Sequence, residues 1–94
     1  MNYKIEENIK NIIFKNINKD KFKVFLFGSR AKWNHKKYSD WDIGILWDKQ
    51  IEYEKYLKLK RQLNELPYLI DLVDFHLVDE NFKKLALKYT KPWN

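Results

Sequence analysis

The sequence predicts a single small α/β (α+β) domain in which helices pack on one mixed β-sheet. First, 94 residues without a cysteine fit one domain over residues 1–94 that has no disulfide framework. Second, short apolar runs alternate along the chain with amphipathic helical patterns, as in sheets covered by helices. Third, the loop between the first two predicted strands is too short for a full helical crossover, which favours antiparallel neighbours there.

The first third of the chain predicts one helix and one strand. Isoleucines recur at helical spacing over residues 3–17, which predicts an amphipathic helix. After a polar turn, the apolar run VFLF within 21–27 ends at Gly28 and predicts a short buried strand. Residues 29–39 are polar and predict a loop with one helical turn at its start.

The middle of the chain predicts a strand and a helix. Trp41 to Trp47 is apolar with β-branched and aromatic members, which predicts the second strand. Asp48 is the expected cap of a helix from about Ile51 to Leu66, which Pro67 ends. The apolar and aromatic residues expected on one face of this helix are Tyr53, Tyr56, Leu57 and Leu63.

The last third predicts a third strand over Leu69 to Leu77, with the sequence LIDLVDFHL. Asp79 is the expected cap of a final helix. The apolar residues spaced for one face of this helix are Phe82, Leu85, Ala86 and Tyr89. Pro92 follows this helix.

Charge and hydropathy limit the classes of function. The net charge is +6, from 19 Lys and Arg against 13 Asp and Glu, so the surface attracts polyanions such as nucleotides. A lysine-rich composition without a functional meaning is the alternative. No apolar run is long enough to span a membrane, and the N-terminus lacks a signal-peptide core. We therefore expect a soluble cytoplasmic protein with no membrane partner.

Two aspartates stand where the second predicted strand begins. Asp40 and Asp42 are two residues apart, so in a strand they would point to the same face at a separation of about 6–7 Å. Carboxylates held so close repel each other unless a cation lies between them. Mg²⁺ prefers oxygen ligands and is usually held by one or two carboxylates plus substrate phosphates. The pair therefore predicts a Mg²⁺ site of the kind that serves displacement at phosphorus.

The third predicted strand offers two further carboxylates. Asp71 and Asp74 are three residues apart, so they would face opposite sides of the sheet. Only one of them can join Asp40 and Asp42. We assign Asp71 to the site and expect Asp74 to cap a helix or to pair, although a register slip of one residue would reverse this assignment.

The turn before the aspartates predicts a phosphate site. Gly28 lets the backbone leave a strand sharply and approach a ligand, and the amides of the following turn can donate to phosphate oxygens. The Ser29 hydroxyl adds a donor, and Arg30 and Lys32 add positive charge. A strand, a phosphate turn and paired carboxylates on the next strand together suit a nucleoside triphosphate with its metal.

These segments resemble the polymerase-beta-like nucleotidyltransferase superfamily. The shared features are GSRA at 28–31, SDWDIGIL at 39–46 and IDLVDF at 70–75, and they look most like its minimal nucleotidyltransferases. As an ordered set the three motifs are specific, whereas each alone would be weak. The resemblance spans roughly residues 22–75 and implies a nucleotidyltransferase-like fold.

The resemblance also implies roles for individual residues. Gly28 and Ser29 would contact the triphosphate, with Arg30 as the adjacent nucleotide-binding cation. The implied catalytic and metal-binding residues are Asp40, Asp42 and Asp71, where Asp71 would orient or deprotonate an acceptor hydroxyl. The implied reaction moves a nucleoside monophosphate, with ATP as the expected donor, to a hydroxyl and releases pyrophosphate.

Many minimal members of this superfamily are antitoxins paired with a HEPN-type toxin, and some resemble protein AMP-transferases that modify a tyrosine on the toxin. One departure keeps a second hypothesis open, because Trp33 replaces a glycine that is frequent in family loops. That hypothesis is a non-catalytic antitoxin or assembly subunit that acts by contact. A nucleic-acid-binding module is a third interpretation, which leaves Asp40 and Asp42 unexplained.

The remaining residues carry weaker indications. His35 is interpreted as a solvated loop residue and His76 has no companion, so no histidine metal site is expected. The segment 35–38, with two lysines and a tyrosine, is either an ordinary surface or a nucleic-acid patch. Oligomerisation stays open, since aromatic residues can serve the core or an interface. Those in question are Trp47, Tyr53, Tyr56 and Trp93.

Overall fold

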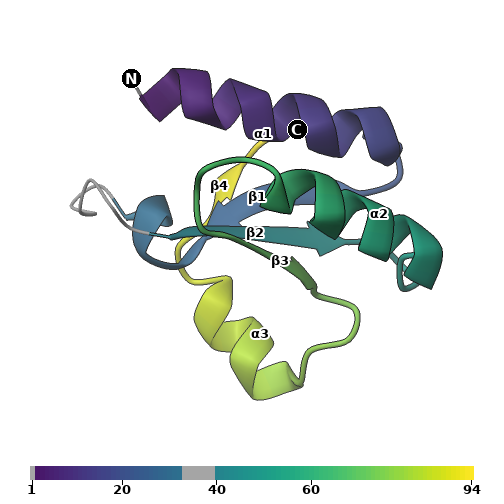
Figure 1. The fold of residues 1–94 in the computed structure, drawn as a ribbon. Helices are drawn as coiled ribbons and strands as arrows, with labels where there is room; N and C mark the ends of the chain where they lie inside the picture. The colour runs from purple at the N-terminus through teal and green to yellow at the C-terminus, as the bar shows by residue number, and fades with distance from the viewer. Residues whose placement is uncertain (1, 33–39) are drawn as a thin grey trace.

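A computed structural model describes residues 2–32 and 40–94 of the chain. The elements follow one another in the order seen in Figure 1: α1 (Asn2–Asn16), β1 (Lys23–Phe27), the 3₁₀ helix η1 (Gly28–Ala31), β2 (Trp41–Leu46), α2 (Tyr53–Asn64), β3 (Ile70–Asp74), α3 (Glu80–Ala86) and β4 (Lys91–Pro92). The predicted fold class, helices on one mixed sheet, is confirmed.

The four strands form one sheet in the order β3-β2-β1-β4. β1 is antiparallel to β2, as its short connection predicts, and β2 is parallel to β3 because α2 crosses between them. The strand β4, which the sequence reading missed, is antiparallel to β1 through Phe25↔Pro92 and Leu26↔Lys91. Two residues are too few to show a strand periodicity in the sequence. Proline has no amide N–H to donate, and it is tolerated here because β4 is an edge strand.

Two apolar layers hold the sheet. Helices α1 and α2 cover one face and α3 lies on the other (Figure 1). The larger core lies under α1 and α2, and its fully buried members include Ile9, Ile13, Ile43, Ile45 and Leu59. The smaller core faces α3 and consists of Phe25, Phe27 and Phe75. The Phe75 ring centre lies 4.9 Å from that of Phe25 and 5.0 Å from that of Phe27.

The start of α2 and the residues on its core-facing side differ from the prediction. The helix begins at Tyr53 after Glu52, and no side chain caps it, so Asp48 is not its cap. Its buried residues are Leu59 and Leu63. Successive residues of a helix are rotated by about 100° around its axis. Leu57 lies two positions before Leu59 and therefore points away from the buried side. Tyr53 lies in the exposed first turn, and both Tyr53 and Leu57 are exposed.

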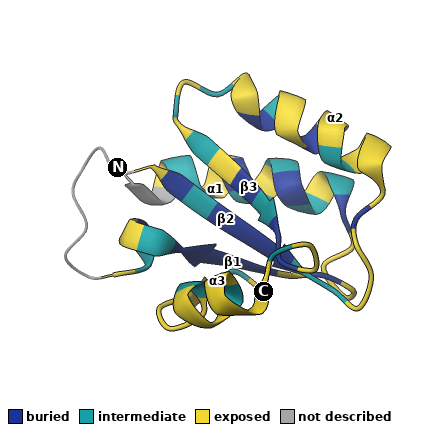
Figure 2. Cartoon of the chain, turned by 90° about the horizontal axis from the view of Figure 1, so that it is seen from below, coloured by how far each residue is buried: buried dark blue, intermediate teal, exposed yellow. Residues whose placement is uncertain are grey.

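Helix α3 is capped as predicted but buries little. The Phe82 amide donates to Asp79 Oδ1 at 2.7 Å, which confirms the cap. The helix ends at Ala86, and Leu85 and Tyr89 remain 65% and 58% exposed. Figure 2 shows α3 largely in the exposed colour, while β1 and β2 are mostly buried. The predicted apolar face of this helix is therefore mostly a surface.

The third strand is shorter than predicted and ends at Asp74 instead of Leu77. The His76 amide donates to Asp74 Oδ1 at 3.0 Å, and the Leu77 amide donates to the Asp74 carbonyl at 3.0 Å. These bonds turn the chain immediately after Asp74 and stop the pairing with β2.

Candidate active site

The sheet register brings two of the three predicted site carboxylates side by side. Asp42 on β2 is opposite Asp71 on the parallel strand β3, and residues paired in this way project from the same face. Asp42 also pairs with Phe27, which belongs to the core under α3. The two carboxylates therefore lie on the α3 face, beyond the end of its aromatic cluster. Asp40 is exposed and lies one residue before β2.

Asp74 serves the opposite face. It is 5% exposed, and its Oδ2 accepts a hydrogen bond from the Ile51 amide at 3.0 Å while its Oδ1 accepts from the His76 amide. These bonds fasten the segment before α2 and the turn after β3 to the sheet. Asp74 is thus a structural carboxylate, and Asp71 is the one that lies beside Asp42.

Gly28 lies directly against Asp42. Its φ is +72°, a left-handed conformation that side chains with a Cβ rarely adopt. A Cβ at this position would clash with Asp42 Oδ2 and would lie 3.2 Å from Asp42 Cγ. Both the turn and the close approach therefore require glycine. The turn continues as η1 with Ser29 exposed, so its hydroxyl is open to a ligand.

Arg30 is held rigidly within this turn. It is 6% exposed, and its guanidinium carbon lies 4.0 Å from the centre of the Trp41 ring, a stacked cation–π geometry. Burial lowers the pKa of Arg30, and the nearby charge of Asp40 acts against that shift. The guanidinium therefore places a positive charge beside Trp41 at the start of β2 and near Asp40.

The surroundings of Asp42 disfavour the charged form of its carboxylate. Its pKa is raised, first by burial and then by the charges of Asp71 and Asp40. A divalent cation between these carboxylates would remove the repulsion. Within residues 2–32 and 40–94, no group of three or more His, Cys, Asp or Glu side chains is arranged to hold a metal ion. Mg²⁺ is usually held by only one or two carboxylates, with phosphate oxygens of a substrate completing its coordination, and the neighbouring Asp42 and Asp71 fit that arrangement.

Comparison with known proteins decides the family. The family described as "Polymerase beta, Nucleotidyltransferase" matches residues 7–91. The chain belongs to this family. That assignment and the mixed sheet confirm the resemblance seen in the three motifs.

One named relative of the chain is described as an adenylyltransferase. The chain is 35% identical over 69 residues to the "Probable protein adenylyltransferase MntA" of Haemophilus influenzae. This match covers 71% of the chain and only 60% of that relative's length.

Solved structures agree on the fold. A structure described as a toxin–antitoxin with AMP-PNP is 25% identical, with a TM-score of 0.72 over 93% of this chain and 70% of that one. A complex of a tri-AMPylated Shewanella oneidensis HEPN toxin with an MNT antitoxin gives 24% identity and a TM-score of 0.73 over 98% and 71% of the two chains. At 24% identity the second likeness concerns the fold alone.

Two cavities flank the carboxylates of this nucleotidyltransferase fold. One has a volume of about 420 Å³ and contains Asp71, with Tyr53, Tyr56 and Val73 among its walls. The other has a volume of about 500 Å³ and lies between Gly28 and α3. Sequence reasoning missed both, because it left the aromatic residues of α2 open between core and interface and gave the apolar residues at α3 only a shared helix face. Their helical spacing indicates only that they share a face.

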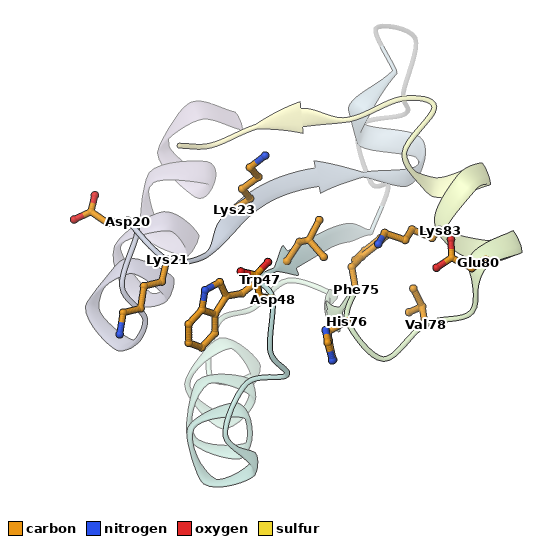
Figure 3. Close-up of a pocket in the computed structure, with 11 residues that line it drawn as sticks. Asp20, Lys21, Lys23, Trp47, Asp48, Phe75, His76, Val78, Glu80 and Lys83 are labelled. Carbon is orange, nitrogen blue, oxygen red and sulfur yellow. The ribbon is translucent and has the colours of Figure 1, made fainter.

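A wider cavity of about 730 Å³ lies elsewhere (Figure 3). It is lined by residues at the other end of the sheet, such as Trp47 and His76, several residues beyond Asp42 and Asp71 on their strands. Its charges offset one another, since Lys21, Lys23 and Lys83 line it together with Asp20, Asp48 and Glu80. This balance favours no charged ligand, so we assign it no part in the chemistry.

The remaining predictions concern other parts of the chain. Trp33, His35 and the segment 35–38 lie outside the described residues. His76 is exposed, and no histidine-containing metal group occurs in the described part. Among the described residues no helix is long and apolar enough to cross a membrane.

Proposed function

We propose that residues 1–94 act as a Mg²⁺-dependent adenylyltransferase that moves AMP from ATP to a hydroxyl of a HEPN-type partner protein, as the antitoxin of a pair. The observation that carries this proposal is the contact of the Gly28 turn with Asp42, beside Asp71. A turn that can bind phosphate thus touches Asp42, a carboxylate that can hold the metal. The named adenylyltransferase relative and the toxin–antitoxin structure with AMP-PNP support the same donor and partner.

The reaction is an in-line displacement at the α-phosphorus of ATP. The acceptor oxygen forms a bond to this phosphorus, the bond to the bridging oxygen breaks, and pyrophosphate leaves with the electron pair. The hydroxyl proton passes to the carboxylate of Asp71, which is exposed and so can reach an acceptor. Such chemistry asks a protein mainly for positioning and charge neutralisation.

The chain divides these tasks among its own residues. Gly28 and Ser29 bind the phosphates through backbone amides and the hydroxyl, and Arg30 adds a fixed positive charge. Asp40 and Asp42 would hold Mg²⁺ together with phosphate oxygens of the substrate, and Asp71 beside Asp42 would take the proton of the acceptor. Bound there, the ion would neutralise charge on the phosphates and on the leaving group.

The acceptor approaches from the side of Asp71. The cavity of about 420 Å³ on that side has apolar walls and contains two carboxylates, Asp71 and Asp74, but no lysine or arginine. Such walls suit an uncharged hydroxyl-bearing segment and disfavour phosphate. Because the reaction consumes ATP, we place it in the cytoplasm.

Intact mass spectrometry tests the proposal. The HEPN-type partner is incubated with this protein, ATP and Mg²⁺, and we expect the mass of one or more AMP groups to be added. Asp42→Asn should reduce the rate to about 1% of wild type or less, since loss of metal binding removes several kcal/mol of charge stabilisation. EDTA should have the same effect.

Asp48→Asn is the matched control. Asp48 is an exposed carboxylate just beyond the opposite end of β2, so this variant should transfer AMP at the wild-type rate. An unmodified partner that nevertheless forms a stable complex would overturn the enzymatic proposal and establish an antitoxin that acts by contact.

A further inference from the structure

The cavity between the phosphate turn and α3 differs in charge from the other two. Lys32 and Lys88 are among its lining residues, and no carboxylate is. The cavity on the Asp71 side has carboxylates and no cation, and the wide cavity at the far end of the sheet has both. Of these three, only the α3 cavity favours an anionic ligand.

Aromatic rings are exposed in the same cavity. Phe82 and Tyr89 line it and remain 41% and 58% exposed. Phe82 is fixed by its contacts with Phe27 and Phe75, whose ring centres lie 6.3 and 5.8 Å away. The Lys32 ammonium lies 5.3 Å from the centre of the Tyr89 ring, so a cation and an aromatic face meet at one point.

The cavity is continuous with the phosphate turn. Gly28 and Ser29 are themselves part of its wall, so a ligand whose phosphates bind the turn can extend directly into the cavity. Its volume of about 500 Å³ lies within the range typical of small-molecule sites, and the cavity is open to solvent. The aromatic rings and lysines of this wall suit a ligand in which a flat apolar group is joined to phosphates.

We propose that this cavity binds the nucleobase of the donor nucleotide, with the base stacked on Tyr89 and bounded by Phe82. Lys32 and Lys88 line the same cavity as the phosphate turn, so their charges would partly neutralise the phosphates of the bound nucleotide. The inference rests on the proposed function, which supplies the nucleotide. Phe82 and Tyr89, which lie outside the three sequence motifs, thereby become part of the nucleotide site.

Calorimetric titration of the full chain with two ligands tests this site. AMP-PNP with Mg²⁺ carries a base, whereas inorganic tripolyphosphate with Mg²⁺ carries only the phosphates. Tyr89→Ala should weaken binding of AMP-PNP about tenfold or more, the usual effect of losing one base–aromatic stack. Its affinity for tripolyphosphate should equal that of wild type.

Three further variants sharpen the result. Tyr89→Trp should retain AMP-PNP binding because it keeps an aromatic face, while Tyr89→Leu should weaken it although it keeps apolar bulk. Leu69→Ala is the control, since Leu69 is an apolar residue, 73% exposed, that lines none of the three cavities. It should bind AMP-PNP as wild type does. Circular dichroism verifies that each variant is folded.

The inference is overturned if Tyr89→Ala binds AMP-PNP as wild type does, or if it loses both ligands equally. It is also overturned if wild type binds no AMP-PNP, which would remove the proposed function as well. The two failures are otherwise distinct. AMP transfer without dependence on Tyr89 removes the base site alone, and Tyr89-dependent binding without transfer removes the enzymatic proposal alone.

Discussion

At the scale of single residues, ionised Asp42 destabilises the metal-free fold. It is half-buried next to Asp71 and touches the Gly28 turn. Burial and its two acidic neighbours raise its pKa above the usual value for aspartate. A carboxylate kept in such surroundings fits a cation-binding role, because the repulsion is relieved only when a positive charge is bound.

The raised pKa of Asp42 gives a pH-dependent prediction for the metal-free protein. A carboxyl whose pKa is higher in the folded state destabilises the fold when ionised, and this cost disappears below the unfolded-state pKa of about 4. We therefore expect Asp42→Asn to raise the Tm at pH 7 in EDTA, with a gain that shrinks to zero as the pH falls through the folded pKa to about 4. Thermal unfolding across this range measures it.

Asp48→Asn is again the control and should show no comparable gain. A gain for Asp42→Asn that is equal at pH 4 and pH 7 would contradict the electrostatic explanation, since it would show that packing, not charge, sets the difference.

At the scale of elements, β3 carries two aspartates with opposite tasks. Alternation along the strand sends Asp71 to the α3 face beside Asp42 and Asp74 to the α1–α2 face. Asp74 accepts the Ile51 and His76 amides and so fixes both chain segments that adjoin the strand. Within this strand of five residues, the aspartate on one face belongs to the candidate active site and the aspartate on the other face stabilises the fold.

Paired substitutions in β3 should separate stability from transfer. Asp74→Ala leaves the Ile51 amide without its acceptor in a buried place and should lower the free energy of unfolding by about 1–3 kcal/mol. Asp71→Ala should change it by less than about 0.5 kcal/mol, while AMP transfer to the partner falls at least about a hundredfold. Urea denaturation measures the first effect and mass spectrometry the second.

The reverse pattern would show that the two aspartates have been assigned to the wrong faces of β3. Loss of stability in both variants would instead show that Asp71 has a structural task as well.

At the scale of the whole molecule, the last residues join the N-terminal helix to the sheet. The Trp93 amide donates to the Val24 carbonyl at 2.8 Å, and its indole Nε1 donates to Glu6 Oε1 at 2.8 Å. Asn94 Oδ1 accepts the Val24 amide at 2.9 Å, and Asn94 Nδ2 donates to the Phe22 carbonyl at 2.7 Å. Segments about 70 to 90 positions apart along the chain are thereby held together at the edge of β1.

Trp93→Ala should therefore destabilise the whole fold, although Trp93 is only half-buried. It removes a hydrogen bond to a carboxylate and part of an aromatic contact with the larger core, so we expect a loss of about 2–3 kcal/mol in the free energy of unfolding. Urea denaturation measures it. Tyr53→Ala, at an exposed aromatic residue, should change the same quantity by less than about 0.5 kcal/mol, and an equal loss in both would contradict this account.

The sequence by itself determined the order of the main elements, the mixed sheet and the family. Local patterns carry this information: isoleucine spacing marks α1, the VFLF run marks β1, and the ordered motifs around Gly28, Asp42 and Asp71 mark the nucleotidyltransferase. Even the opposite orientation of Asp71 and Asp74 follows from strand alternation. Each of these features depends on residues close together in the chain.

Only the tertiary structure decided which carboxylate is adjacent to Asp42, because register between strands depends on packing across the sheet. It also revealed β4, whose pairing with β1 has no periodic signal, and the exposed rings of Phe82 and Tyr89. Helical spacing places such rings on one face, but whether that face meets a core or open space depends on what the rest of the chain places opposite it. That is a long-range property, so no local pattern of residues contains it.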